Sequence, residues 1–520
     1  MRVVVIGAGH NGLAAAFHLA AAGLQPLVFE ARSEIGGGAI TTEIHPGFRC
    51  PTLTHEVLLH ERIARDMRLA RRGLEFVRPQ VDRCALRLDG APAVLYQDVA
   101  RTATDLANQS PRDVEPFLTF AATLRHNARV IASLAGAPPP RTEGMGARDA
   151  LTWVMAARRF RALPARDAHQ LLRWISMPIA DVVRDAVDDS LLQATIAGPA
   201  LVGTKLGPGS AGTTLLMLIR EAHRQLAGGG VRIPIGGPGA VTGAMAAAAR
   251  EAGARIDVDA PVEQILVDGG RVRGVVVRGR EQAADVVLSG IDPKTTWWLA
   301  GMPETDPAMN HRIRHYRVTG TLAKINLALA ALPSFAGIGT DRTLLDGRLQ
   351  IGPSLDYLER ACDCAKYGEI SPEPWLDVAI PSILDPDLAP PGAHVVSIYA
   401  HCVPRDLRSG DWAAAADAIL RTVMGTLEQY APGVSALVVG AQVITPRVLQ
   451  RDYGFAGGHV FHGEMALDQL FAMRPVFGCG RYRTPVRGLY MCSAGTHPGG
   501  FMTAASGRLA ATELIRDLKW

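Results

Sequence analysis

A chain of 520 residues has room for a large hydrophobic core and two or three subdomains. Hydrophobic residues make up 48% and charged residues 20%, as in ordinary globular enzymes, and the net charge of only +4 does not indicate a nucleic-acid-binding protein. No apolar run reaches the roughly 18–20 residues of a membrane-spanning helix, and a strand predicted from residue 2 leaves no room for a leader segment.

The first 30 residues carry the pattern of a βαβ unit. Residues 2–6 form a β-branched run that predicts a buried strand, residues 13–20 predict a helix that ends at Gly23, and residues 27–29 predict a second strand. The turn between strand and helix reads Gly-x-Gly-x-x-Gly over residues 7–12. This arrangement is typical of a dinucleotide-binding site.

Each glycine of this turn has a physical role. Gly7 permits the tight turn, Gly9 lets a pyrophosphate approach the backbone, and Gly12 lets the helix pack close to the strand. The helix N-terminus offers free N–H groups to the phosphates. Glu30, at the end of the second strand, can accept hydrogen bonds from both ribose hydroxyls. The alternative is an Ala/Gly-rich turn without a ligand.

A second glycine cluster, residues 36–38, follows Glu30 and suits a longer dinucleotide. Together with the threonines after it, this cluster resembles the double-glycine motif of the FAD-dependent amine oxidase and phytoene dehydrogenase superfamily, which implies FAD as a resident cofactor. Gly38 stands where that family usually has an arginine, which removes one phosphate contact. The further cofactor contacts that the resemblance implies in this region are His10, Asn11, Ala31, Arg32, Gly37 and Gly38.

Residues 56–230 are predicted to form a largely helical cap. Helices are expected near residues 113–134, 151–161, 168–176 and 179–187, with short strand-like stretches at 75–77 and 84–88. Residues 213–226 combine an apolar half with a polar half. We favour a buried helix with a polar end, and the alternative is a helix that contacts a membrane surface.

Residues 231–292 are predicted to return to the first domain. They contain a helix over 241–252, strands over 255–258 and 284–289, and a hairpin that pairs 262–267 with 271–277. This segment resembles the part of the family fold that extends the nucleotide-binding sheet. The resemblance implies that Val262 contacts adenine through its backbone.

Residues 293–482 are expected to form a separate mixed sheet that makes one wall of a substrate cavity, with strands at 321–329 and 393–400 and a helix at 411–430. Lys324, on the first of these strands, could orient a water or polarise a substrate beside the flavin, or it is simply a lysine at a polar-facing strand position. His462, in a Gly-rich loop, is a second catalytic candidate or a structural histidine.

The C-terminal segment repeats the pattern of strand, Gly-rich loop and helix. Residues 488–492 predict a strand and residues 504–518 a helix, whose N-terminus suits the negative charge of a reduced flavin. The loop, Gly-Thr-His-Pro-Gly over residues 495–499, resembles the corresponding motif of bacterial phytoene desaturases, and residues 461–464 and 473–475 narrow the likeness to the phytoene-dehydrogenase-like branch. This resemblance implies flavin contacts at Gly495, Gly500, Phe501, Met502 and Thr503, with His497 as a third catalytic candidate.

The seven cysteines are scattered and none has C-x-x-C spacing. Reduced thiols in a cytoplasmic protein are therefore expected, and a flavin disulfide reductase is disfavoured. Cys362 and Cys364 have no second ligand pair, so we expect no metal site.

The predicted fold is α/β. A discontinuous Rossmann-like FAD-binding domain (residues 1–55, 231–292 and 483–520) carries the helical cap (56–230) and a mixed α+β substrate domain (293–482). The resemblance implies an FAD-dependent oxidoreductase that desaturates an apolar or polyene-like molecule by hydride transfer to flavin N5. Its partners would be that substrate and an electron acceptor, such as oxygen or a quinone, with no nucleic acid.

Three alternatives stay open. An amine or amino-acid oxidase on the same fold would need an aromatic pair beside the flavin, and only Phe501 and Tyr490 lie near the C-terminal motif. A redox-neutral isomerase would use reduced flavin, and a flavoprotein scaffold would bind partners without turnover.

Overall fold

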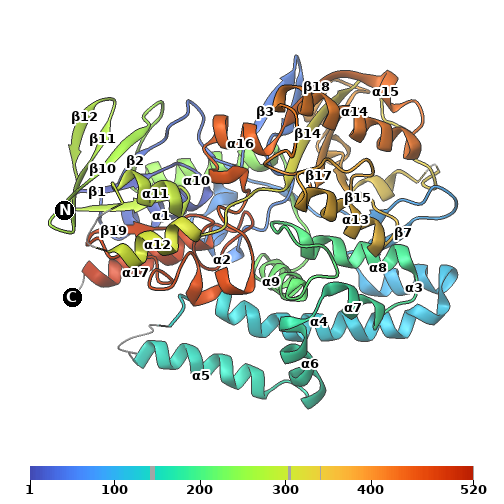
Figure 1. Cartoon of the computed structure of the whole chain (residues 1–520), viewed down its shortest axis with the longest axis horizontal. Coiled ribbons are helices and arrows are strands. Elements are labelled where there is room, and N and C mark those ends of the chain that lie inside the picture. Colours follow the sequence, from blue (N-terminus) through green and yellow to red (C-terminus); the bar gives the residue numbers. More distant parts are fainter. Residues whose placement is uncertain (141–146, 303–305, 340, 519–520) are drawn as a thin grey trace.

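Five short strands from distant parts of the chain form one parallel sheet (Figure 1). The computed structural model describes residues 1–140, 147–302, 306–339 and 341–518. The strand order is β19 (Leu489–Met491), β13 (Val286–Ser289), β1 (Val3–Ile6), β2 (Leu27–Phe29) and β9 (Arg255–Asp257). The start, middle and end of the chain therefore meet in a single Rossmann-like sheet.

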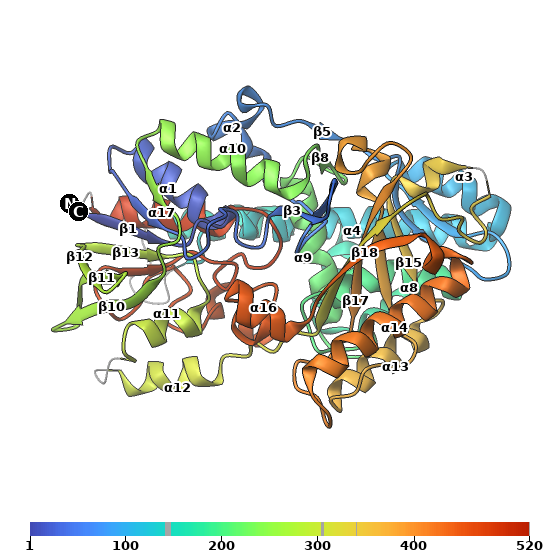
Figure 2. The ribbon, with the colours of Figure 1, turned by 90° about the horizontal axis from the view of Figure 1, so that it is seen from above.

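Three alanine-rich helices cover one face of this sheet (Figure 2). They are α1 (His10–Ala21), α10 (Gly237–Glu251) and α17 (Ala505–Leu518). Their small buried side chains, such as Ala15, Ala248 and Ala510, let the helices pack closely on one another and on the sheet. On the other side stands an antiparallel sheet of β10 (Val262–Asp268), β11 (Arg271–Val277) and β12 (Arg280–Ala283).

A seven-stranded sheet forms the second body of the molecule. Its order is β18 (Val438–Ile444), β14 (Leu322–Leu329), β17 (His394–His401), β16 (Leu376–Ala379), β15 (Arg348–Ile351), β6 (Val81–Ala85) and β7 (Ala93–Tyr96). Helices α13 (Leu355–Lys366) and α14 (Trp412–Tyr430) follow β15 and β17, and α15 (Val434–Leu437) leads into β18. All eight residues of β14 are buried, so this strand lies at the centre of the core.

The predicted domain division needs one correction, because β6 and β7 lie in the segment expected to be a helical cap. Backbone pairing with β15 extends the substrate sheet: Cys84 of β6 aligns in parallel with Leu349. Both side chains are fully buried in the core of that sheet. Strand β6 therefore belongs to the substrate sheet, and it also contacts the helical cap, since Ala85 packs against Leu191 of the cap in a small buried cluster.

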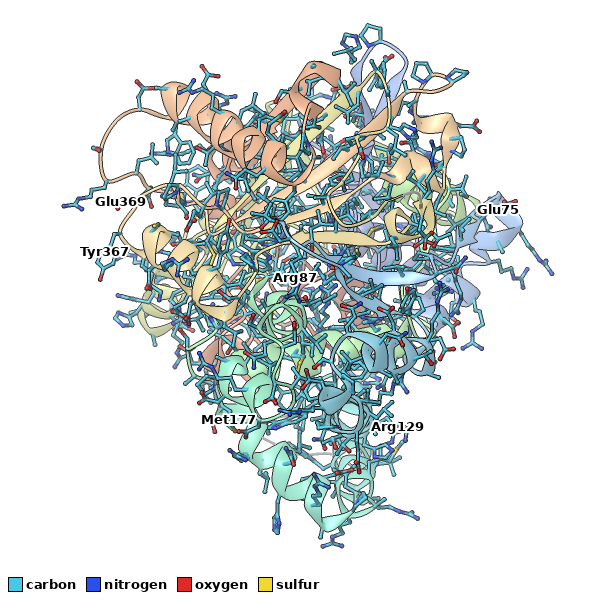
Figure 3. All side chains as sticks on the ribbon, turned by 90° about the vertical axis from the view of Figure 1, so that its right-hand side faces the viewer. Glu75, Arg87, Arg129, Met177, Tyr367 and Glu369 are labelled. Atoms are coloured by element: carbon cyan, nitrogen blue, oxygen red, sulfur yellow. A yellow bond between two sulfur atoms is a disulfide. The ribbon has the colours of Figure 1, made fainter. Side chains whose placement is uncertain are left out.

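The rest of the cap is helical and packs below the seven-stranded sheet (Figure 3). It contains α3 (Val99–Gln109), α4 (Val114–Ala135), α5 (Ala147–Arg161), α6 (Ala165–Ser176), α7 (Ile179–Arg184), α8 (Ser190–Ala197) and α9 (Thr213–Leu226). Arg87, at the junction in Figure 3, joins the two layers through an ion pair of 2.9 Å with Asp189. Helix α9 is largely buried, which confirms the favoured interpretation of residues 213–226.

Short elements connect these layers. They are β3 (Thr41–His45), β4 (Phe48–Pro51), α2 (Glu61–Asp66), β5 (Phe76–Val77), β8 (Ile233–Pro234), α11 (Pro293–Leu299), α12 (Pro307–His315) and α16 (Pro446–Tyr453). Among the helices described, none is long and apolar enough to cross a bilayer.

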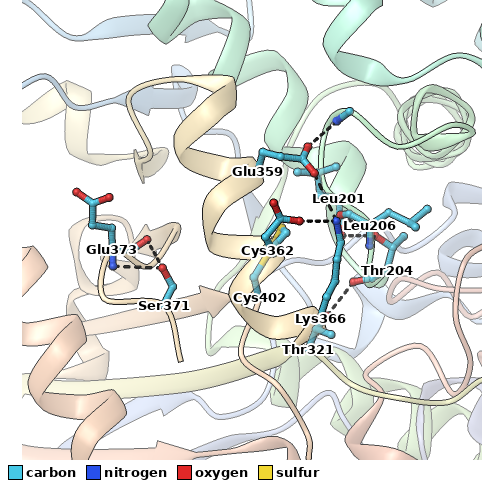
Figure 4. Close-up of a disulfide and its surroundings, with 12 residues drawn as sticks. Leu201, Thr204, Leu206, Thr321, Glu359, Cys362, Lys366, Ser371, Glu373 and Cys402 are labelled. Atoms are coloured by element: carbon cyan, nitrogen blue, oxygen red, sulfur yellow. Dashed lines mark hydrogen bonds and ion pairs between the residues drawn. A yellow bond between two sulfur atoms is a disulfide. The ribbon is translucent and has the colours of Figure 1, made fainter. Parts of the chain in front are cut away.

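The expectation that every cysteine is reduced is wrong for one pair. Cys362 of α13 and Cys402, just after β17, form a disulfide (Figure 4). The two residues lie on different elements, 40 positions apart, with a Cα–Cα distance of 4.8 Å. Folding of α13 onto the end of β17 brings them together, and no local spacing pattern announces such a contact.

Candidate cofactor and substrate site

A cavity of about 530 Å³ runs from the carboxyl ends of β1 and β2 to β14 and β17 of the second sheet. Most of the predicted cofactor residues line it: Gly7, Gly9, His10, Asn11, Gly12, Glu30, Ala31, Arg32, Gly37, Gly38, Val262, Phe501 and Met502. Gly495, Gly500 and Thr503 lie next to this wall in sequence but outside it. Glu30 and the C-terminal loop thus open onto the same cavity.

Backbone contacts between glycines shape the nucleotide end of the cavity. A Cβ atom on Gly12 would lie 2.0 Å from the Gly7 carbonyl oxygen, so a side chain there is sterically excluded. The second glycine cluster packs beside the first, since the Gly36 N–H donates to the Ala8 carbonyl at 2.9 Å. The wall is consequently bare backbone, which a diphosphate can approach closely.

Glu30 is held in place by the backbone around it. Its buried carboxylate accepts hydrogen bonds from the N–H groups of Ala8, at 2.7 Å, and Arg32, at 3.1 Å. Each carboxylate oxygen keeps further lone pairs for a ribose hydroxyl. Beside it, the Arg32 guanidinium lies 4.5 Å from the ring centroid of Tyr453, a cavity-lining residue that the sequence did not single out.

Unpartnered polar groups at the cavity fit the charged and polar parts of FAD. Gly9, the residue before helix α1, provides no side-chain cap, so the first N–H groups of the helix are free to receive a phosphate. His10 Nε2 and His462 Nδ1 are buried without a hydrogen-bond partner in the part of the chain that the structure describes. Together with Glu30, these groups match an adenosine, a diphosphate and a polar ring system. The fit supports FAD.

The C-terminal loop closes the other end of the cavity. The segment before α2 crosses this loop, and the Leu58 N–H donates to the Met502 carbonyl at 3.2 Å. Phe501 adopts a left-handed backbone with φ of 48°. Its ring packs 4.9 Å from that of Phe461 and 5.5 Å from that of His223. The bulky side chain therefore forms part of the cavity wall.

The structure does not bring the three catalytic candidates together, since only His462 lines the cavity. Burial lowers the pKa of His462 to about 3, and His10 and His459 act in the same direction, so its imidazole is neutral at physiological pH. His497 lies outside the cavity wall, with Nε2 3.1 Å from the carbonyl oxygens of Leu134 and Ala137 at the end of α4. This contact supports a structural role for His497.

Lys324 lies one layer behind the cavity. Its ammonium group donates to Ser397 Oγ at 2.6 Å and to the Asn326 side chain, and Nζ is 5.6 Å from the ring centroid of Tyr399, which lines the cavity. Burial lowers the pKa of Lys324 to about 8, against the opposing effect of Cys50 and Asp377. Lys324 therefore orders strand side chains and does not itself form the cavity wall.

Sequence reasoning missed a network of buried charges at the sheet end of the cavity. Glu56, which lines the cavity, pairs with Arg220 at 2.9 Å and lies 3.7 Å from Arg348. Arg348 and Arg83 both pair with Asp377, at 3.2 and 3.1 Å. Burial alone would raise the pKa values of both acids, but the guanidinium groups outweigh it and hold them below their usual range. The partners lie on separate elements, and no local motif signals them.

Comparison with protein families decides the assignment. A family model described as "Flavin containing amine oxidoreductase" matches residues 178–515, more than half of the chain. The chain belongs to this family. A second model, "NAD(P)-binding Rossmann-like domain", matches residues 5–66, which hold the glycine motifs. The predicted family, the Rossmann-like fold and the FAD cofactor are confirmed, and the protein is an FAD-dependent oxidoreductase.

Individual relatives span almost the whole chain. Rat "Pyridine nucleotide-disulfide oxidoreductase domain-containing protein 2" is 33% identical over 99% of this chain and 93% of its own length. "Phytoene desaturase (lycopene-forming)" of Pseudescherichia vulneris is 26% identical, with complete coverage of both chains. Cyclohexylamine oxidase from Brevibacterium oxydans shares the fold with a TM-score of 0.61 at 15% identity, over 100% of this chain and 99% of its own.

Proposed function

We propose that this oxidoreductase dehydrogenates an apolar, polyene-like small molecule, forming a carbon–carbon double bond. The observation that carries the proposal is the wall beyond the nucleotide end, where Val202, Leu322 and Phe461 join Phe501 and Met502. Such a wall binds hydrocarbon and excludes water. Bound FAD supplies the hydride acceptor, flavin N5. Similarity to a phytoene desaturase supports the same substrate class.

The titratable groups of the cavity suit this reaction. Burial lowers the pKa of His10 to about 4 and that of His462 to about 3, so both imidazoles are uncharged at neutral pH. Glu56 is tied to Arg220 and is not free to act as a base. His462 can accept a hydrogen bond from substrate or water at its free Nδ1, while the proton lost by the substrate passes to solvent.

An amine oxidase is the second candidate, favoured by one contact. The expectation of few aromatic rings near the C-terminal motif is wrong, because Phe461 packs beside Phe501 at 4.9 Å and both line the cavity. Such a pair can orient an amine. The same cavity wall therefore fits either a hydrocarbon or an amine substrate, and the following experiment distinguishes the two.

The test begins with the absorbance spectrum of purified protein and mass spectrometry of the small molecules extracted from it. Anaerobic addition of linear polyenes or primary amines follows, and the class that bleaches the flavin band is the substrate class. Loss of two hydrogens from a polyene identifies desaturation. A product of unchanged mass, formed by protein reduced with dithionite, identifies isomerisation, and neither bleaching nor any product supports the scaffold alternative.

A pair of phenylalanine variants connects this test to the cavity. Phe461→Ala removes part of the apolar wall and enlarges the cavity. It should lower the rate of bleaching by the polyene by roughly 10-fold, because the substrate loses packing contacts near the flavin. Phe477→Ala, at a phenylalanine that is 46% exposed and outside the cavity, is the matched control and should react like the wild type. Equal bleaching rates for the two variants would show that Phe461 does not contact the substrate.

A further inference from the structure

A surface cleft beside the cofactor cavity is lined by cations. It has a volume of about 730 Å³, and it shares Thr295 and Gly454 with the cavity wall. No carboxylate lines it in the described part of the chain. Its charged or titratable lining residues, here called the basic cleft, are Lys294, Arg314, His315, Arg317 and Arg405. They come from α11, from the end of α12 and the residues after it, and from the segment after β17.

Not all of these charges are neutralised by neighbours. Arg317 pairs with Asp468 and Glu464, and Arg405 pairs with Asp406. Lys294 and Arg314, in contrast, form no ion pair with any residue that the structure describes. The Lys294 ammonium donates only to the Arg314 carbonyl oxygen, at 2.9 Å. The basic cleft therefore presents free positive charge to a ligand.

A second groove continues the basic cleft along the surface. It shares Thr319 and Arg405 with the cleft and adds Lys205, Lys366 and Arg408, with Asp406 as the one acid among its lining residues in the described chain. Lys366, drawn in Figure 4, forms its ion pairs within its own helix α13, and the next residue, Tyr367 (Figure 3), also lines the groove. The cations are thus spread over an open surface and do not converge on one point.

Only a thin wall separates the basic cleft from the cofactor cavity. Leu322 and Phe455 face the cavity, whereas Thr319 and Gly457, on the same two segments, face the cleft. The Gly320 N–H donates to the Gly457 carbonyl at 2.9 Å, so the two segments lie backbone to backbone. The wall at this point is therefore a single layer of paired backbone.

Glycines allow the two segments of this wall to approach each other closely. A Cβ on Gly320 would lie 2.0 Å from the Gly458 carbonyl oxygen, and one on Gly457 would lie 2.0 Å from the Val318 carbonyl oxygen. A hydrogen bond also crosses the wall, since the Tyr316 hydroxyl donates to the His462 carbonyl at 2.8 Å. Electron transfer slows steeply with distance, so a thin hydrogen-bonded wall suits passage of electrons from cavity to cleft.

We propose that the basic cleft docks an acidic electron-carrier protein, which reoxidises the reduced flavin. Free positive charge is spread over residues of α11 and α12, two neighbouring helices in Figure 2, and of nearby loops. Such a spread matches an acidic protein surface, whereas a small anion would need donors that converge in an enclosed site. The inference rests on the proposed function for the source of the electrons. Each dehydrogenation removes two electrons and two protons from the substrate; two carrier molecules take one electron each, and both protons go to water.

The test supplies electrons without a substrate. Holoprotein is reduced anaerobically with dithionite, freed of excess reductant, and mixed with acidic plastocyanin or basic cytochrome c, two one-electron acceptors of opposite charge. Return of the flavin absorbance gives the rate. We expect plastocyanin to react faster at low ionic strength and to slow as salt screens the attraction. Calorimetry of oxidised plastocyanin with oxidised holoprotein gives the affinity independently of turnover.

Charge reversal locates the docking site. Arg314→Glu combined with Lys205→Glu changes two exposed side chains, one in the cleft and one in the groove, and should lower both the plastocyanin rate and its affinity by roughly 10-fold or more. Arg273→Glu, on strand β11 outside both the cleft and the groove and with a side chain 64% exposed, is the matched control and should change neither. Reoxidation by an uncharged benzoquinone should be equal in all variants.

Several results would overturn the proposal. Equal plastocyanin rates and affinities in wild type and the double variant would exclude docking at the cleft, as would a wild type that plastocyanin cannot reoxidise. Saturable binding of inorganic pyrophosphate that the double variant abolishes, without any change toward plastocyanin, would assign the cleft to a small anion. A flavin that dithionite reduces but no polyene or amine bleaches contradicts the proposed function alone, and the docking result still stands.

Discussion

The two ends of the cofactor cavity are built in different ways. At the nucleotide end, glycine backbone and one carboxylate from the first 38 residues make the wall, and hydrogen bonds to neighbouring N–H groups hold the carboxylate. At the sheet end, ion pairs join Glu56 to Arg220 and Arg348, and Arg348 to Asp377. The first end is local in sequence, and the second depends on the whole tertiary fold.

This difference has an energetic consequence. A glycine turn tolerates no added atoms, but it carries no net charge and needs no distant partner. A buried ion-pair network is balanced only while every member is present, because a charge left alone in the interior costs several kcal/mol. We therefore expect substitutions at the nucleotide end to act mainly on FAD binding, and those at the sheet end to act mainly on folding.

The largest effect is expected for Gly12→Ala. Its new Cβ would meet the Gly7 carbonyl at 2.0 Å, and both atoms belong to the backbone turn that receives the diphosphate. We predict that FAD affinity falls by more than about 100-fold, or that the protein is purified without flavin. The flavin absorbance of the protein after gel filtration measures how much FAD stays bound. Gly243→Ala, on the exposed side of α10 with no atom within 4 Å, is the control and should stay yellow.

The next effect belongs to the sheet end. Asp377→Asn leaves Arg83 and Arg348 without their shared carboxylate and should lower the free energy of unfolding by about 3–5 kcal/mol. Because the folded pKa of Asp377 lies well below its unfolded value of 3.8, its contribution is present above that pH and is lost as the pH falls further. Denaturant unfolding at pH 7 measures the loss.

The control for that substitution is Asp363→Asn. This carboxylate pairs with Lys366 at the surface, where its side chain is 50% exposed. It should change the free energy of unfolding by less than about 0.5 kcal/mol. If Asp377→Asn were equally mild, the buried network would not be a stability element, and the contrast between the two ends of the cavity would fail.

What the sequence could predict follows the same contrast. The glycine turn before α1, the strand that ends at Glu30 and the hairpin of β10 and β11 were predictable, because steric demands of neighbouring residues determine them. The discontinuous nucleotide domain followed from three separate strand patterns. Thirteen of the predicted cofactor positions line one cavity. Some of them, such as Val262, are predicted only by the family resemblance.

Features that depend on distant pairing were not predictable. Arg220 and Glu56 are 164 positions apart and Arg83 and Asp377 are 294 apart, so no window of sequence contains either pair. The pairing of β6 with β15, the Phe461–Phe501 contact and the Cys362–Cys402 disulfide have the same origin. The strand pattern singles out Lys324 as a candidate. It does not show that Tyr399 of the neighbouring strand lines the cavity in place of Lys324.

A pH experiment sharpens the position of Lys324. Its folded pKa of about 8 lies below the unfolded value of 10.5, so the unfolded chain binds more protons between these values and stability rises with pH there. The gain amounts to roughly 3 kcal/mol for this group. Lys324→Met should lack that rise when unfolding is measured from pH 7.5 to 10.5, whereas Lys205→Met, at an exposed position, should follow the wild-type curve. Identical slopes in all three proteins would contradict burial of the ammonium group.

The smallest effect tests the nucleotide end by charge alone. Glu30→Gln keeps the size of the side chain, but its amide can face only one of the two backbone N–H donors with oxygen and cannot attract ribose hydroxyls as a carboxylate does. FAD affinity should fall about 10-fold, or ~1.4 kcal/mol, as followed by quenching of flavin fluorescence on titration of apoprotein. Glu34→Gln, at an exposed acid 3.8 Å from Arg32, is the control for the loss of one charge nearby and should bind FAD as the wild type does. If both variants bound equally tightly, the carboxylate would serve only to fold the turn, and specificity for the nucleotide would rest on the glycine backbone.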